Sequence, residues 1–162
     1  MFVSEVLQNL SDNLKQQVAL YEEFTKQERA KQKALIENNL SEIEAITARE
    51  EQFLLLASRL EKERLLWAGH IGREFEKAPE DLTLAELAVR FPILEGVRRE
   101  LDLVVGRLQE IHEINVQLLQ QAMKVVDFTL GMLTHQASNT YTHPQRKENE
   151  GNGKLHLLDW RI

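Results

Sequence analysis

The sequence of 162 residues contains no cysteine, three prolines and seven glycines, and aromatic residues make up only 6% of it. The absence of cysteine excludes a disulfide framework, a cysteine-ligated metal and catalysis by a thiol. The small numbers of prolines, glycines and aromatic residues, beside many leucines and 28% charged residues, are typical of helices rather than sheets. The length corresponds to one domain, with or without a tail.

The sequence also has no long apolar run. A membrane-spanning helix needs roughly 20 apolar residues, and no segment approaches this length. The N-terminus MFVSEVLQNLSDNLKQQ has neither the basic start nor the continuous apolar core of a signal peptide. The formal net charge of −6 argues against general binding to nucleic acid or to an anionic membrane. We therefore expect a cytoplasmic protein that does not insert into a membrane.

The first segment with helical periodicity ends at a pair of asparagines. Its apolar residues recur every three or four positions and predict one helix over about residues 4–37. Asn38 and Asn39 tolerate the left-handed conformation that ends a helix. Asn39 followed by Glu42 also fits a capping box, and an overlapping box begins at Ser41. The chain is therefore expected to turn sharply here and to return as an antiparallel helix.

Three helices are expected after the first one. The second long helix should end by Ala78, because a residue that precedes proline disfavours the helical conformation. Thr83 with Glu86 forms another capping box and predicts the start of a short connecting helix. The last long helix is expected over about residues 93–133.

Two apolar lines run along the last helix. The main line takes alternating steps of three and four residues, which is the spacing of a coiled coil. It comprises Val97, Leu101, Val104, Leu108, Ile111, Asn115, Leu118, Ala122, Val125, Thr129 and Met132. A flanking line of Val105, Leu119, Val126 and Leu133 widens the face. Because a face this wide needs more than one neighbour, we expect the helix to pack against both other long helices.

These elements predict an all-α fold, an elongated antiparallel bundle of three long helices and one short connecting helix with coiled-coil-like packing. Residues 1–133 form the helical bundle domain, and residues 134–162 form a flexible C-terminal tail. A thin rod offers no deep pocket, and the sequence has no phosphate-binding glycine loop and no nucleophile elbow. We expect no catalytic residue, no cofactor and no metal site. The five histidines are expected to be solvated or incidental, and His112 is expected to face outward beside the main line.

Asn115 occupies a position in the main line where an apolar residue is expected. One interpretation is a polar group in the core that sets the register of the bundle. The other is a polar contact with a partner on an open part of the face. The pattern favours the first interpretation and leaves the second open.

The end of the chain differs from the rest, because helical periodicity stops near residue 135. The segment ASNTYTHPQRKENEGNGKLHLLDWRI is first polar and then closes with an apolar cluster at Leu155, Leu157, Leu158, Trp160 and Ile162. The cluster either folds back onto the bundle, has no role, or contacts a partner.

An ordered set of segments resembles the FlgN family of flagellar export chaperones. The segments are LYEEFTKQERAKQKALIENNLSEIEAITAREEQFL, LTLAEL, LQEIHEINVQLLQQAMKVVDFTLGML and NTYTHPQ, and they extend over nearly the whole chain. The last helix carries Asn115 followed by paired leucines, and Tyr141 follows that helix, as in the family. The chain departs from the family at Pro144, where relatives often have a glycine.

The resemblance implies a cytoplasmic type III flagellar export chaperone. Such a protein binds hook-associated (hook–filament junction) proteins through their C-terminal helical segments, prevents their premature self-association and delivers them to the export gate. Tyr141 corresponds to a family tyrosine implicated in docking at this gate, and the export ATPase is a further implied partner. The client-binding residues are expected on the last helix and in the tail, at Asn115, Leu119, Val126, Leu133, Leu155, Leu157, Leu158, Trp160 and Ile162.

Two other classes of protein remain open. One is a coiled-coil adaptor or scaffold that homo-oligomerises through its apolar stripe and has no export client. The other is a helical protein that binds nucleic acid through Arg90, Arg98, Arg99 and Arg107, although the net charge of −6 counts against it.

Overall fold

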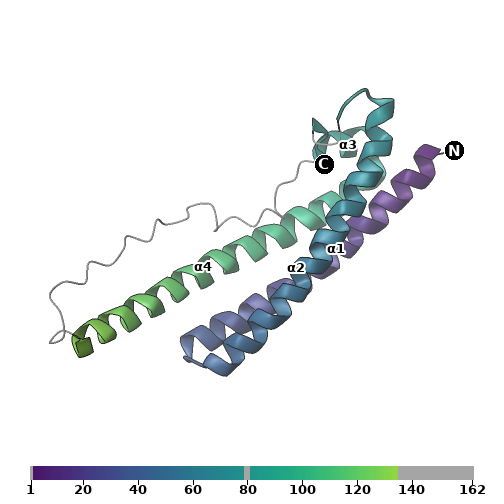
Figure 1. The fold of residues 1–162 in the computed structure, drawn as a ribbon. Coiled ribbons are helices and arrows are strands. Elements are labelled where there is room, and N and C mark those ends of the chain that lie inside the picture. Colours follow the sequence, from purple (N-terminus) through teal and green to yellow (C-terminus); the bar gives the residue numbers. More distant parts are fainter. Residues whose placement is uncertain (1, 79–80, 135–162) are drawn as a thin grey trace.

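The computed structural model describes residues 2–78 and 81–134, and the elements within these ranges confirm an all-α bundle (Figure 1). The predicted flexible tail lies outside the described residues, so the division into bundle and tail stays a prediction. The long helices are α1 (Phe2–Ile36), α2 (Leu40–Glu74) and α4 (Glu95–Thr134). The connection between α2 and α4 contains α3 (Leu84–Arg90) and a 3-10 helix (Pro92–Leu94).

The helices α1 and α2 form an antiparallel hairpin that turns at the predicted asparagine pair. Asn38 adopts a φ of 53°, the left-handed conformation. Asn39 is the N-cap of α2, and its side chain accepts a hydrogen bond of 3.3 Å from the Glu42 backbone N–H. The hydroxyl of Ser41 donates to the Asn39 side chain at 3.1 Å and does not form a cap of its own. The helix therefore begins with an N-cap at Asn39, and the reciprocal half of the predicted capping box is not formed, because the Asn39 N–H donates to the Ala34 carbonyl at 2.9 Å.

The end of α2 comes four residues before the expected Ala78. The backbone N–H groups of Phe75 and Lys77 both donate to the Gly72 carbonyl, and Glu76 adopts a φ of 53°. A Cβ atom on Gly72 would lie 2.6 Å from the Lys77 carbonyl oxygen, so this close return of the chain requires glycine. The tight turn ends the helix before Pro79 can act.

The short helix α3 begins with the predicted capping box. The Glu86 N–H donates to the Thr83 hydroxyl at 3.1 Å, and the Thr83 N–H donates to the Glu86 carboxylate at 3.4 Å. Both groups would otherwise be left without a partner at the helix start. The cap fixes the chain between the hairpin and α4, and Leu84 and Leu87 of α3 enter the core.

Replacing Thr83 by alanine is expected to lower the free energy of unfolding by about 1 kcal/mol, because the capping hydroxyl is lost. Urea denaturation of the full chain measures this change. Thr83→Ser keeps the hydroxyl and should remain close to the parent protein. An equal loss in both variants would show that the cap does not supply this stability.

The core forms where α1 lies against both α2 and α4. It contains Leu10, Leu14 and Tyr21 of α1 and Leu101 and Leu108 of α4, all buried. Close backbone contacts join α1 to α2 and α1 to α4, whereas α2 and α4 do not approach each other to a comparable extent. The last helix therefore packs mainly on α1, and not equally on both helices as the width of its apolar face predicted.

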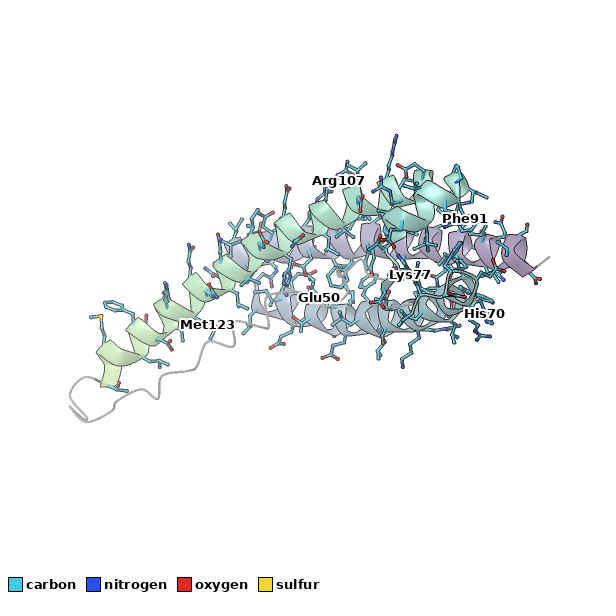
Figure 2. All side chains as sticks on the ribbon, turned by 90° about the horizontal axis from the view of Figure 1, so that it is seen from above. Glu50, His70, Lys77, Phe91, Arg107 and Met123 are labelled. Atoms are coloured by element: carbon cyan, nitrogen blue, oxygen red, sulfur yellow. The ribbon has the colours of Figure 1, made fainter. Side chains whose placement is uncertain are left out.

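The last helix runs past the turn of the hairpin. Figures 1 and 2 both show its C-terminal end projecting beyond the point where α1 and α2 are joined. From Leu119 to Thr134 every described residue except Ala122 is exposed. This part of α4, residues 119–134, is called the α4 extension below.

Candidate functional site

The α4 extension exposes a large amount of apolar side chain to water. Its only charged residues are Lys124 and Asp127. The exposed fractions of its large apolar side chains run from 42% at Leu119 to 77% at Leu133. Contiguous exposed apolar surface of this kind marks a site of interaction with another protein segment. The large apolar residues concerned are Leu119, Met123, Val125, Val126, Phe128, Leu130, Met132 and Leu133.

A groove separates the start of the α4 extension from the hairpin turn. Its volume is about 400 Å³. The hairpin contributes Leu35, Asn38, Leu40 and Ile43 to its walls. The opposite wall is formed by Leu119, Ala122, Met123, Val126 and Asp127 of α4. This tip groove is mostly apolar, and Figure 2 shows Met123 on the stretch of α4 that leaves the hairpin.

Ala122 of the main line reaches the groove, but beyond it only the flanking line of α4 continues along the groove. A heptad spacing drifts by about 20° per seven residues on a straight α-helix, so from Val97 to Met132 the main line turns by about 100°. Its last members, Val125 and Met132, are 65% and 66% exposed and do not line the groove. Leu119 and Val126 of the flanking line do line it. The expectation that the whole main line faces the bundle is therefore wrong for its C-terminal part.

Asn115 lies about one turn of α4 before Leu119, outside the lining of the tip groove, and is only 2% exposed. Its Nδ2 donates to the backbone carbonyl of Glu28 at 2.7 Å and to the Glu28 Oε2 at 2.8 Å. These bonds tie α4 to α1 at one fixed position along both helices. The geometry favours the interpretation of Asn115 as a polar core group, and in this conformation a client could not reach its side chain.

Glu28 and Asn115 belong to a buried polar group contributed by three helices, called the junction cluster below. Lys31 of α1 donates to both carboxylate oxygens of Glu50 of α2, at 3.2 and 3.1 Å. His112 of α4 places its Nδ1 3.9 Å from the Glu28 Oε2. His112 is 22% exposed and faces a carboxylate, so the expectation that its side chain faces outward is wrong. The cluster comprises Glu28, Lys31, Glu50, His112 and Asn115.

The two carboxyl groups of the junction cluster share one proton near neutral pH. Burial by itself would raise the pKa of Glu28, but polar contacts from His112, Glu50 and Asn115 outweigh it and lower this pKa to about 2. Burial and the neighbouring Glu28 carboxylate raise the pKa of Glu50 to about 7, although Lys31 acts in the opposite direction. The proton therefore resides on Glu50 while Glu28 is ionised.

The predicted client-binding residues fall into three groups. Leu119 and Val126 line the tip groove, and Leu133 is exposed farther along the extension. Asn115 is buried in the junction cluster. Tyr141 and the tail residues lie outside the described part of the chain, and their roles stay predictions. These tail residues are Leu155, Leu157, Leu158, Trp160 and Ile162.

Several residues of this site carry no binding role in the sequence pattern. Met123 fits neither apolar line. Leu35 and Ile43 belong to the two helices of the predicted hairpin, for which no binding role is expected. Phe128 stands apart from both lines and is 70% exposed. A count of apolar residues around the whole circumference of α4, rather than along one stripe, would have found Met123 and Phe128. No local sequence signal marks the residues of the hairpin wall, since their position beside α4 depends on where α4 crosses α1.

The remainder of the described chain carries little other site chemistry. Within residues 2–78 and 81–134, no set of three or more histidine, aspartate or glutamate side chains is placed to hold a metal ion. None of the helices in those ranges is both long and apolar enough to cross a membrane. A second groove lies between the start of α1 and the end of α2, where Trp67 stacks near His70 with ring centroids 6.0 Å apart.

Comparison with known families gives one match. A family model described as FlgN protein matches residues 1–149. The matched range contains every described residue and Tyr141, and it ends before the apolar cluster of the tail. No curated protein matches the chain. No solved structure matches it either.

Proposed function

The chain belongs to the FlgN family of flagellar export chaperones, and from this membership and the exposed α4 extension we propose that it binds hook-associated proteins. The client is the C-terminal helical segment of a hook–filament junction protein. By covering this segment in the cytoplasm, the chaperone prevents premature self-association. It then delivers the client to the export gate, with the export ATPase as a further partner.

The observation that carries the proposal is the apolar surface of the α4 extension beside the tip groove. An amphipathic helix binds by laying its apolar face in a groove of this kind. Covering three large apolar side chains contributes roughly 3–6 kcal/mol before the costs of association are subtracted. This contribution does not by itself exceed the roughly 4–15 kcal/mol that association costs, so the other side chains of the α4 extension and the tail would have to supply the remainder.

The client helix would lie along the flanking line of α4. Leu119 and Val126 form one wall of the tip groove, and Leu35 and Ile43 form the other. Leu133 extends the same line toward the end of the helix. Asp127 at the rim could pair with a basic residue of the client and so favour one orientation.

The tail is proposed to supply a second set of anchors. It begins directly after the α4 extension, so its apolar residues can reach a client held there. Trp160 is the expected hot spot, because a large aromatic side chain buries much area at low entropic cost. Tyr141, which lies between the extension and these anchors, is proposed to dock the loaded chaperone at the export gate.

Calorimetry with a purified hook-associated protein tests the proposal. We expect binding near 1:1 by the full chain, and at least about tenfold weaker binding by a chain cut after Leu133 or carrying Trp160→Ala. Equal binding by all three proteins would retain the chaperone function and remove the tail from the site. Failure of every form to bind would contradict the chaperone function.

The adaptor interpretation makes a different prediction from the same surface. If the α4 extension pairs with a second copy, the mass in solution should rise with concentration, and a hook-associated protein should have no effect on it. Light scattering with and without the client separates the two functions. A client that forms a 1:1 complex supports the chaperone.

A further inference from the structure

The junction cluster lies one to two helical turns before the residues that line the tip groove, on all three long helices. Leu35 follows Glu28 by two turns of α1, and Ile43 precedes Glu50 by two turns of α2. Leu119 follows Asn115 by about one turn of α4. Beyond Asn115, every residue of α4 is exposed or half-buried. The cluster is thus the final buried contact that holds α4 before the groove opens.

The contacts of the cluster connect its protonation to the position of α4. Asn115 is held by the Glu28 carboxylate at 2.8 Å, and His112 faces the same carboxylate at 3.9 Å. Glu50 approaches from α2, and Lys31 from α1 balances one negative charge. Whatever displaces the Glu28 carboxylate therefore weakens the attachment of α4 to α1. The Asn115 Nδ2 also donates to the Glu28 backbone carbonyl at 2.7 Å, so displacement of the carboxylate removes one of the two hydrogen bonds that attach Asn115 to α1.

We propose that the junction cluster is a proton-sensitive pivot that sets the width of the tip groove. The groove is narrow while Glu28 and Glu50 share one proton, and it widens when that proton is lost. This inference rests on the proposed function in one respect. If the tip groove receives the client helix, the width of the groove decides how readily that helix enters.

Loss of the proton places two negative carboxylates beside a single lysine in a buried site. Burying a second, uncompensated charge is costly, so the carboxylates must separate or reach water. The hairpin turn joins α1 and α2 close to the cluster and restrains both helices. The α4 extension packs on neither helix beyond the groove, so α4 is the element that can swing away.

The sign of the pH effect follows from Glu50. Its pKa is about 7 in the closed cluster, and when the carboxyl group is solvated it returns toward its ordinary 4.5. The closed form, in which the groove is narrow, consequently binds the proton more tightly than the open form, in which it is wide. The free-energy advantage that this proton gives the closed form is full below about pH 4.5 and is lost as the pH rises through about 7. Glu28, with its pKa near 2, stays ionised above pH 4.5 and adds no change in this window. Between pH 6 and pH 8 the ratio of closed to open forms should fall about tenfold.

Distances between two spin labels across the groove test the pivot without a client. The chain has no cysteine, so Glu44→Cys on α2 and Lys124→Cys on α4, both exposed, give two unique labelling sites. In the otherwise unchanged full chain, the distance distribution measured by double electron–electron resonance should shift to longer values between pH 6 and pH 8. Glu50→Gln, which keeps a neutral side chain, should hold the pH 6 distribution at both values.

The matched control is Glu51→Gln, at an exposed neighbour of Glu50. It should retain the full pH response of the labelled parent chain. A distribution that does not change with pH in the parent chain would overturn the pivot, as would an unaltered response in Glu50→Gln. Neither result bears on calorimetric binding of a hook-associated protein, so failure of the pivot and failure of the chaperone function are distinguished.

Discussion

Replacing Leu119 and Val126 together by aspartate is expected to weaken binding of a hook-associated protein at least about 100-fold. Both side chains line the tip groove on the α4 side, and a charge at either position would have to be desolvated against the apolar face of the client. A loss of roughly 1.4 kcal/mol at each position corresponds to tenfold in affinity, and two such losses multiply. Calorimetry on the full chain measures the effect.

Stability should change little in this double variant, because the two side chains are 42% and 55% exposed. The matched control is Leu55→Asp with Leu66→Asp on α2, where the leucines are still more exposed and lie far from the groove. The control adds the same two charges and should bind the client as the parent protein does. Similar losses in both double variants would show that overall charge, and not the groove, decides binding.

Replacing Leu101 by alanine is expected to lower the free energy of unfolding by about 2–5 kcal/mol. Leu101 is 0% exposed and belongs to the core formed between α4 and α1. Its truncation removes buried apolar area and leaves a cavity that straight helices cannot close by small shifts. A domain of this size is stable by only about 5–15 kcal/mol, so this one side chain supports much of the bundle.

The control for this prediction lies two residues away on the same helix. Leu103 is 61% exposed, so Leu103→Ala changes helix propensity in the same way but removes little buried area. Its effect on the free energy of unfolding should stay within about 0.5 kcal/mol. Urea denaturation of both variants separates packing from propensity. Equal losses would contradict the packing of α4 on α1 described above.

Local signals in the sequence were sufficient to predict the helices and most of the positions at which they begin. The turn at Asn38, the cap at Asn39 and the capping box at Thr83 all depend on residues within about one helical turn of each other. The physical reason is that a backbone N–H at a helix start must find a partner nearby. The early end of α2 was missed, because the left-handed position in its final turn is occupied by Glu76 and not by the glycine or asparagine that usually marks such an end.

The family resemblance, and not the composition of α4, predicted that part of this helix would be left for a partner. The flanking line placed Leu119, Val126 and Leu133 on one face, and the first two of them line the tip groove. The coiled-coil spacing of the main line pointed to a different face. Which line continues toward the hairpin depends on how far a straight helix turns along its length, and packing on α1 settles this.

By itself, the sequence determined that the protein is helical, where most of its helices begin, that it has no cysteine-based site, and which family it resembles. Tertiary structure alone decided that Asn115 contacts Glu28 across 87 positions of sequence, and that Glu50 and His112 lie beside them. It also decided that Leu35 and Ile43 face Leu119 across the tip groove. Hydrogen bonds and apolar periodicity within a helix act over a few residues and can be found in a pattern. The pairing of distant side chains depends on the angle and the register at which whole helices pack, and these emerge only when the complete core is formed.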